Sequence, residues 1–93
     1  MRLVWLPRAR TARTDAIAHI AKDSPRAALG QLDEIEKQTD MLIDQPEMGR
    51  PGRVKETREL VIGRTPFIVV YRIRLAAERS EVLYFLHGAQ QWP

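Results

Sequence analysis

Hydrophobic positions in the first half of the chain recur every three or four residues, which is the spacing of an amphipathic helix. One such segment covers residues 7–22 and has a narrow, alanine-rich apolar face. A second begins after Ser24, which can cap free backbone N–H groups, with Pro25 suited to the first turn. This second segment continues to about residue 44. The first half therefore predicts two helices, and the β-branched and aromatic residues 2–6 before them predict a strand.

In the second half the pattern changes to short apolar runs separated by turn residues. Runs at residues 57–62, 67–74 and 81–87 read as three strands, and the short turns between them imply an antiparallel meander. Residues 45–53 contain two prolines and two glycines and predict a loop. We therefore expect one domain over residues 1–93, of α+β class and order β-α-α-β-β-β. Its two N-terminal helices should pack on a small antiparallel sheet.

Alternation along the run 67–74 separates the two faces of the predicted central strand. Phe67, Val69, Tyr71 and Ile73 fall on one wholly apolar face, which should receive the helices. Arg72 and Arg74 fall on the opposite face, which we expect to be the working surface. Arg58, on the preceding run, can lie on either face, because the pattern does not determine its register.

Charge is unevenly distributed along the chain. The formal net charge is +3, yet residues 50–74 hold seven Lys and Arg against two Glu. Such a field attracts nucleic acid or an acidic protein segment, and an ordinary solvated basic rim is the alternative. The arginines of this field that we take as candidate binding residues are Arg50, Arg53, Arg58, Arg72 and Arg74.

Composition excludes several classes of site. The absence of cysteine excludes disulfides, thiolate zinc sites and cysteine nucleophiles. The two histidines lack metal-ligand spacing, so we expect no metal and no cofactor. No apolar stretch approaches the roughly 20 residues of a membrane helix, and the first residues do not resemble a signal peptide. We therefore expect a cytoplasmic protein that does not interact with membranes.

Two residues near the end of the chain are further candidates. His87 follows the last apolar run and could act as a general acid or base, or could simply bond to the backbone. Trp92 could stack on a partner, although folding back to fill a gap between helices and sheet is the more common arrangement for a terminal tryptophan. His19 should be solvated on the outer face of the first helix.

Four segments in this order resemble the RelE/ParE toxin superfamily. They are residues 45–50 (QPEMGR), 57–62 (TRELVI), 65–73 (TPFIVVYRI) and 86–93 (LHGAQQWP). The resemblance implies the toxin of a type II toxin-antitoxin module, associated with growth inhibition and plasmid stabilisation. It also implies a cognate antitoxin whose C-terminal segment wraps along the toxin, and contact with operator DNA only through that antitoxin. The basic rim favours an acidic, amphipathic antitoxin.

Within the superfamily, the chain looks more like ParE than RelE. In RelE-like ribonucleases, basic residues act at positions that correspond here to Glu59, Val61 and Ile68. The ParE resemblance implies poisoning of DNA gyrase by binding, without chemistry performed by the toxin. Two alternatives remain: a small basic nucleic-acid-binding module, or a ribosome-dependent mRNA endoribonuclease with catalytic candidates Arg58, Arg72 and His87.

Overall fold

The computed structural model describes residues 1–88 and 90–92. Ala89 and Pro93, which belong to the terminal segment of the predicted motif, lie outside the described residues. The elements in chain order are β1 (Arg2–Trp5), α1 (Pro7–Asp23), α2 (Pro25–Asp44), β2 (Arg50–Pro51), β3 (Arg58–Val61), β4 (Phe67–Arg74), the 3-10 helix η1 (Leu75–Ala77) and β5 (Arg79–His87).

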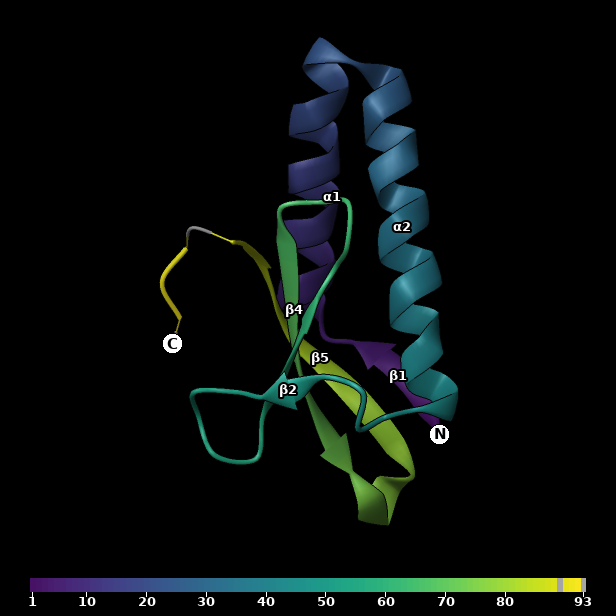
Figure 1. The fold of residues 1–93 in the computed structure, drawn as a ribbon, viewed down its shortest axis with the longest axis vertical. Helices are drawn as coiled ribbons and strands as arrows, with labels where there is room; N and C mark the ends of the chain where they lie inside the picture. Colours follow the sequence, from purple (N-terminus) through teal and green to yellow (C-terminus); the bar gives the residue numbers. More distant parts are fainter. Residues whose placement is uncertain (89, 93) are drawn as a thin grey trace.

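The two predicted helices form an antiparallel hairpin that stands beside the sheet and projects past one end of it (Figure 1). The hairpin turns at Ser24, whose hydroxyl oxygen accepts a hydrogen bond from the N–H of Ala27 at 3.1 Å. Pro25 occupies the first turn of α2, where its missing N–H removes no helical bond. The cap predicted from the sequence is therefore present. Neither helix is long and apolar enough to span a membrane within the described residues.

The sheet has the strand order β1-β5-β4-β3-β2. Strands β2 to β5 pair antiparallel, as the short turns predict, and the α+β architecture is confirmed. β1, however, runs parallel to β5, with Arg2 opposite Arg79, so the sheet is mixed rather than wholly antiparallel. A parallel pair becomes possible because the whole helical hairpin, and the rest of the sheet after it, separates these two strands along the chain.

The predicted loop 45–53 contains the two-residue strand β2, and Tyr71 of β4 anchors the loop. The Tyr71 hydroxyl donates to the Pro46 carbonyl at 2.6 Å and accepts from the Gly49 N–H at 2.9 Å. A Cβ atom at Gly49 would lie 2.7 Å from that hydroxyl, so a glycine is required there by close approach. Burial raises the pKa of Tyr71 and keeps the hydroxyl protonated as a donor.

The core lies between the hairpin and one face of the sheet, and confirms the predicted apolar face of β4. Phe67, Val69 and Tyr71 are at most 4% exposed. They pack in one cluster with side chains from both helices and from β5, namely Ala9, Ile35, Leu42, Val82 and Phe85. The opposite face of the sheet, which we call the helix-free face, therefore carries the remaining strand side chains.

Candidate functional site

A buried carboxylate, Glu59 of β3, joins three segments on the helix-free face. Its residue is 5% exposed. Oε1 accepts from the guanidinium of Arg50 at 3.0 Å, and Oε2 accepts from the indole N–H of Trp92 at 3.0 Å. Burial alone would raise the pKa of Glu59, but the hydrogen bonds from Arg50 and Trp92 outweigh it and hold the pKa below its ordinary value. Glu59 is thus ionised at neutral pH and ties β2 and the C-terminal segment to the sheet.

A second buried carboxylate, Glu81 of β5, is 3% exposed and lies among three arginines. Arg72 donates to Oε1 at 2.8 Å, and Arg79 donates from Nε to Oε2 at 2.8 Å, with its Nη2 2.7 Å from the same oxygen. Arg74 approaches Oε1 to 3.8 Å. The hydrogen bond from Arg72 is the main reason that the pKa of Glu81 lies below its ordinary value; burial opposes it. Two of the predicted binding residues, Arg72 and Arg74, therefore have a counter-ion inside the protein.

Two other arginines of the predicted field hold backbone carbonyls. Arg53 donates to the carbonyl of Trp92 at 3.0 Å, and Arg58 donates to the carbonyls of Glu47 and Gly49 at 3.1 and 2.8 Å. Arg58 consequently stabilises the loop before β2. Part of the basic field therefore binds acceptors within the protein. The sequence does not predict this, because Glu59 and Glu81 resemble ordinary surface residues on alternating strands.

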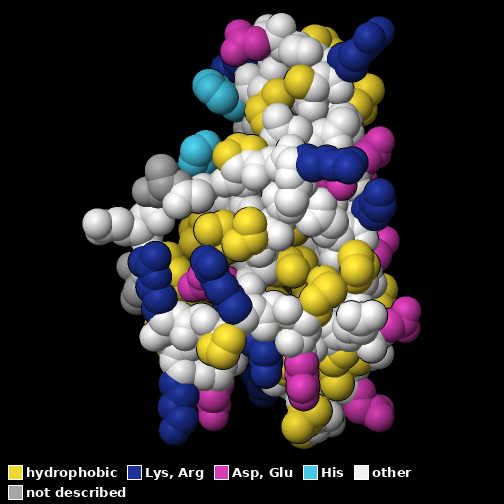
Figure 2. All heavy atoms as spheres, viewed as in Figure 1, with side chains coloured by type: hydrophobic (Ala, Val, Ile, Leu, Met, Phe, Trp, Pro, Cys, Tyr) yellow, Lys and Arg dark blue, Asp and Glu magenta, His cyan; other side chains and the backbone are white. Residues whose placement is uncertain are grey.

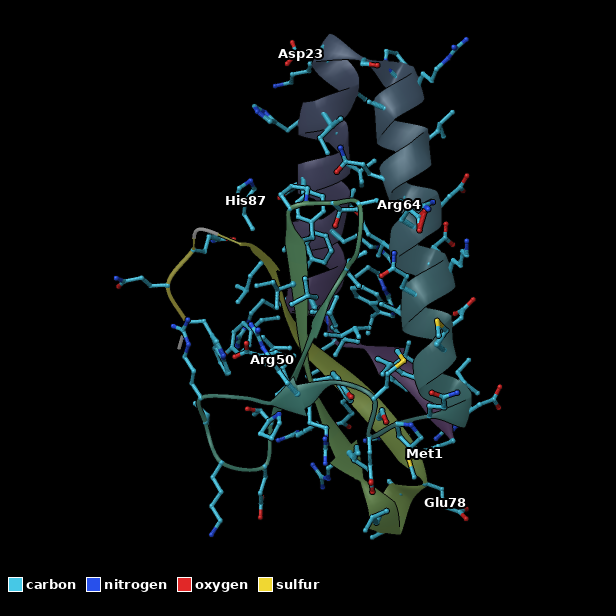
Figure 3. All side chains as sticks on the ribbon, in the orientation of Figure 1. Met1, Asp23, Arg50, Arg64, Glu78 and His87 are labelled. Atoms are coloured by element: carbon cyan, nitrogen blue, oxygen red, sulfur yellow. The ribbon has the colours of Figure 1, made fainter. Side chains whose placement is uncertain are left out.

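The three candidates for ribonuclease chemistry do not come together. Arg58 pairs with Tyr71 and lies on the helix side of the sheet, which resolves its register, whereas Arg72 lies on the helix-free face with Glu81. His87 pairs with Phe67, five residues along β4 from Arg72, which is roughly 17 Å of strand. In Figure 3, His87 accordingly lies toward one end of the sheet, well away from Arg50.

Trp92 folds back and is 7% exposed. The sequence suggested that it would fill a gap between helices and sheet, and this prediction is wrong. It lies on the helix-free face, with its ring 4.8 Å from that of Tyr84. Arg8 of α1 lies over the same Tyr84 ring, 4.8 Å from its centroid. The tail reaches this position because Glu59 offers a buried acceptor for the indole N–H, and its course back along the sheet is visible in Figure 1.

His87 borders an apolar groove of about 390 Å³ between α1 and the ends of β4 and β5. Its ring meets that of Phe67 edge-on at 6.1 Å. His19 is exposed, as predicted, and lines the same groove; Figure 2 shows both histidines in cyan on one side of the molecule. Gln31 also borders the groove, and its side-chain oxygen is buried without a hydrogen-bond partner among the described residues. The groove can therefore accept an apolar surface that brings one donor.

In residues 1–88 and 90–92, no cluster of three or more histidine, aspartate or glutamate side chains is placed to hold a metal ion. The two buried carboxylates, Glu59 and Glu81, each accept hydrogen bonds from arginine or tryptophan donors. The helix-free face can bind a ligand through its guanidinium groups and the half-buried Tyr84.

Comparison with known proteins identifies the fold and the family. Residues 3–92 match the family model of the ParE toxin of the type II toxin-antitoxin system parDE. The chain is 41% identical over 92 residues to a protein of Sinorhizobium fredii named "Putative toxin Y4kP", covering 99% of this chain and 93% of that protein. Among solved structures, the chromosomal ParDE TA system from P. aeruginosa matches with a TM-score of 0.80 at 24% identity, covering 94% of this chain and 95% of that one. The chain therefore belongs to the ParE toxin family of type II toxin-antitoxin systems.

Proposed function

We propose that this ParE-family protein poisons DNA gyrase by binding it, and that a cognate antitoxin neutralises it. The family supports a toxin with an antitoxin partner. The observation that favours binding over RNA cleavage is the separation of Arg58, Arg72 and His87 on two faces and at two ends of the sheet. General acid-base cleavage needs such groups within hydrogen-bond reach of one substrate.

The apolar groove beside His87 is the best candidate for the antitoxin. Its walls come from α1 and from the aromatic rings of Phe67 and Phe85, a lining that suits the apolar face of an amphipathic helix. The buried oxygen of Gln31 would gain a partner if the docked segment offered a donor there. We propose that the antitoxin's C-terminal segment docks in this groove.

The target is tested with purified toxin and reconstituted gyrase holoenzyme on relaxed plasmid. The expected result is inhibition of supercoiling and accumulation of a trapped cleavage complex at micromolar toxin. No inhibition and no trapped complex at that concentration would rule out gyrase. Primer extension on translated mRNA is run in parallel, and codon-specific cuts that His87→Ala abolishes would instead establish the ribonuclease.

The antitoxin is tested through its gene and its docking groove. A short reading frame with a DNA-binding N-terminus and an acidic C-terminus should lie beside this one, and its product should co-purify with the toxin. Ala16→Gln places a longer side chain in the groove and should weaken that complex, whereas Ala27→Gln, on an exposed part of α2, should not. Equal antitoxin affinity for both variants would contradict docking in the groove.

A further inference from the structure

A β-bulge in β5 turns two neighbouring side chains, Leu83 and Tyr84, away from the core. The register with β4 shifts between Val70 and Tyr71, so Leu83 has no partner residue there. Val82, just before the bulge, is fully buried, whereas Leu83 and Tyr84 are both half-buried. Bulges redirect side chains and are frequent beside binding sites. The bulge therefore presents two partly exposed side chains, Leu83 and Tyr84, on the helix-free face.

Two shallow depressions lie on either side of the bulge and share Arg72, Leu83 and Tyr84 in their lining. The first, of about 460 Å³, is completed by residues 6–8 at the start of α1. The second, of about 320 Å³, is completed mainly by the loop residues 54–57. Both combine apolar side chains with arginine or lysine, and the acidic Glu56 also lines the second. An extended segment crossing the bulge could fill one depression and then the other.

The charged side chains that line these depressions are Arg8, Lys55 and Arg72, against the single carboxylate of Glu56. Three arginines, at positions 72, 74 and 79, share the single carboxylate of Glu81. Arg72 uses its Nε for that contact, and its terminal nitrogens make no hydrogen bond to the described residues. Arg8 adds a further guanidinium over the ring of Tyr84. Figure 2 shows the contrasting distribution elsewhere, with acidic side chains along α2. The site thus offers two guanidinium groups to an anion.

We propose that the bulge patch, defined as Arg8, Arg72, Leu83 and Tyr84, binds an extended acidic segment of the toxin's protein target, with carboxylates flanked by apolar side chains. The inference rests on the proposed function, because it supplies the contact by which the toxin engages that target. Arginine pairs with carboxylates through its planar fork, and the apolar lining accepts neighbouring side chains. The patch lies on the helix-free face, apart from the groove assigned to the antitoxin.

The same geometry favours a protein over a nucleic acid. Arg8 lies over the Tyr84 ring and Trp92 packs against the same ring, so a nucleobase would have to displace one of these contacts in order to stack there. Trp92 itself is buried. Recognition would then depend on carboxylates beside apolar groups, which an acidic polypeptide segment carries and a nucleic-acid backbone does not.

The first test uses a defined probe, a blocked peptide of alternating glutamate and valine, titrated into ¹⁵N-labelled toxin. Amide shifts should change around Leu83 and Tyr84, and the matched peptide of glutamine and valine should bind at least tenfold more weakly. Equal binding of the two peptides, or no change near the bulge, would overturn the patch. Tighter binding of a 20-base-pair DNA duplex at the same residues would overturn the choice of a protein ligand.

The second test asks whether the occupant belongs to the target. Arg8→Glu reverses one charge of the patch, and Arg26→Glu makes the same charge change in the first turn of α2, where Arg26 is exposed. Both place glutamate in a first helical turn, which the helix dipole favours. Arg8→Glu should raise the toxin concentration for half-inhibition of gyrase at least tenfold, and Arg26→Glu should change it less than twofold.

The outcomes separate this inference from the proposed function. If Arg8→Glu loses the peptide but inhibits gyrase like the unmodified toxin, the assignment of the patch to the target is wrong. If the unmodified toxin does not inhibit gyrase, the proposed target fails, and the peptide titration still decides whether the patch binds acidic segments. Antitoxin affinity should be the same for Arg8→Glu and Arg26→Glu, and a selective loss in Arg8→Glu would assign the patch to the antitoxin.

Discussion

The bond between Trp92 and Glu59 should be measurable as a coupling free energy. Trp92→Phe keeps an aromatic ring beside Tyr84 but removes the indole N–H, and Glu59→Leu removes the buried acceptor. A hydrogen bond to a charged group contributes about 1.5–3 kcal/mol. The bond is 3.0 Å long and buried, so solvent does not replace it, and we expect a coupling in that range.

The assay is a double-mutant cycle in urea denaturation at pH 7, followed by far-UV circular dichroism. Trp92→Phe should destabilise the protein strongly when Glu59 is present and weakly in the Glu59→Leu background. Glu59→Leu also removes the ion-pair partner of Arg50, but it does so in both the single and the double variant, so this loss cancels in the coupling free energy. Trp5→Phe with Glu59→Leu is the control, and its effects should add, since Trp5 lies on β1 at the other edge of the sheet.

A coupling below about 0.5 kcal/mol would lie within the error of additivity and would contradict a buried hydrogen bond between Trp92 and Glu59. The C-terminal segment would then not rest on Glu59 in solution. A coupling in the expected range would instead establish the tail as part of the helix-free face. It would also give the lining of one depression of the bulge patch a fixed geometry, because Trp92 borders that depression.

Three further expectations concern stability. Tyr71→Phe should cost roughly 2–3 kcal/mol in urea denaturation, because the Gly49 N–H and the Pro46 carbonyl lose their partner; a loss below about 1 kcal/mol would contradict the anchoring role. Ser24→Ala should cost about 1 kcal/mol in thermal melts, through loss of the α2 cap, and an unchanged melt would count against it. The pKa of Glu81 is depressed, mainly by the Arg72 hydrogen bond, so its stabilisation is present above the ordinary value of 4.5 and is lost as the pH falls through the lower folded pKa. Glu81→Gln should therefore lower stability at pH 7 and flatten its decline below pH 4.5, and an equally steep decline would show that Glu81 is not responsible.

Much of the fold was predictable because its signals are local. The cap at Ser24 and the three- to four-residue periodicity placed both helices within about a residue of their bounds. The alternation from residue 67 to 74 gave β4 and its buried face, since side chains on a strand point to opposite sides without reference to any partner.

The candidate site was less predictable because its parts depend on register. The alternation in β4 correctly predicts that Arg72 and Arg74 lie on the face away from the helices. It does not predict their counter-ion, because Glu81 becomes their neighbour only when β4 pairs with β5. In the sequence, Glu59 is notable only because RelE-like ribonucleases have a basic residue at the corresponding position. Its role as a buried acceptor depends on Arg50 and on Trp92, which is 33 residues further along the chain. The two-residue β2 has no periodicity to detect.

The helices, the central strand, the excess of positive charge and the resemblance to the ParE toxin family follow from the amino-acid sequence alone, because each depends on the identity and spacing of nearby residues. Three features became known only from the folded chain: β1 pairs with β5 in parallel, Trp92 packs on the helix-free face, and Leu83 turns out of the core at a bulge. These depend on contacts between distant segments, whose free energy is gained only when burial, hydrogen bonding and register are satisfied together.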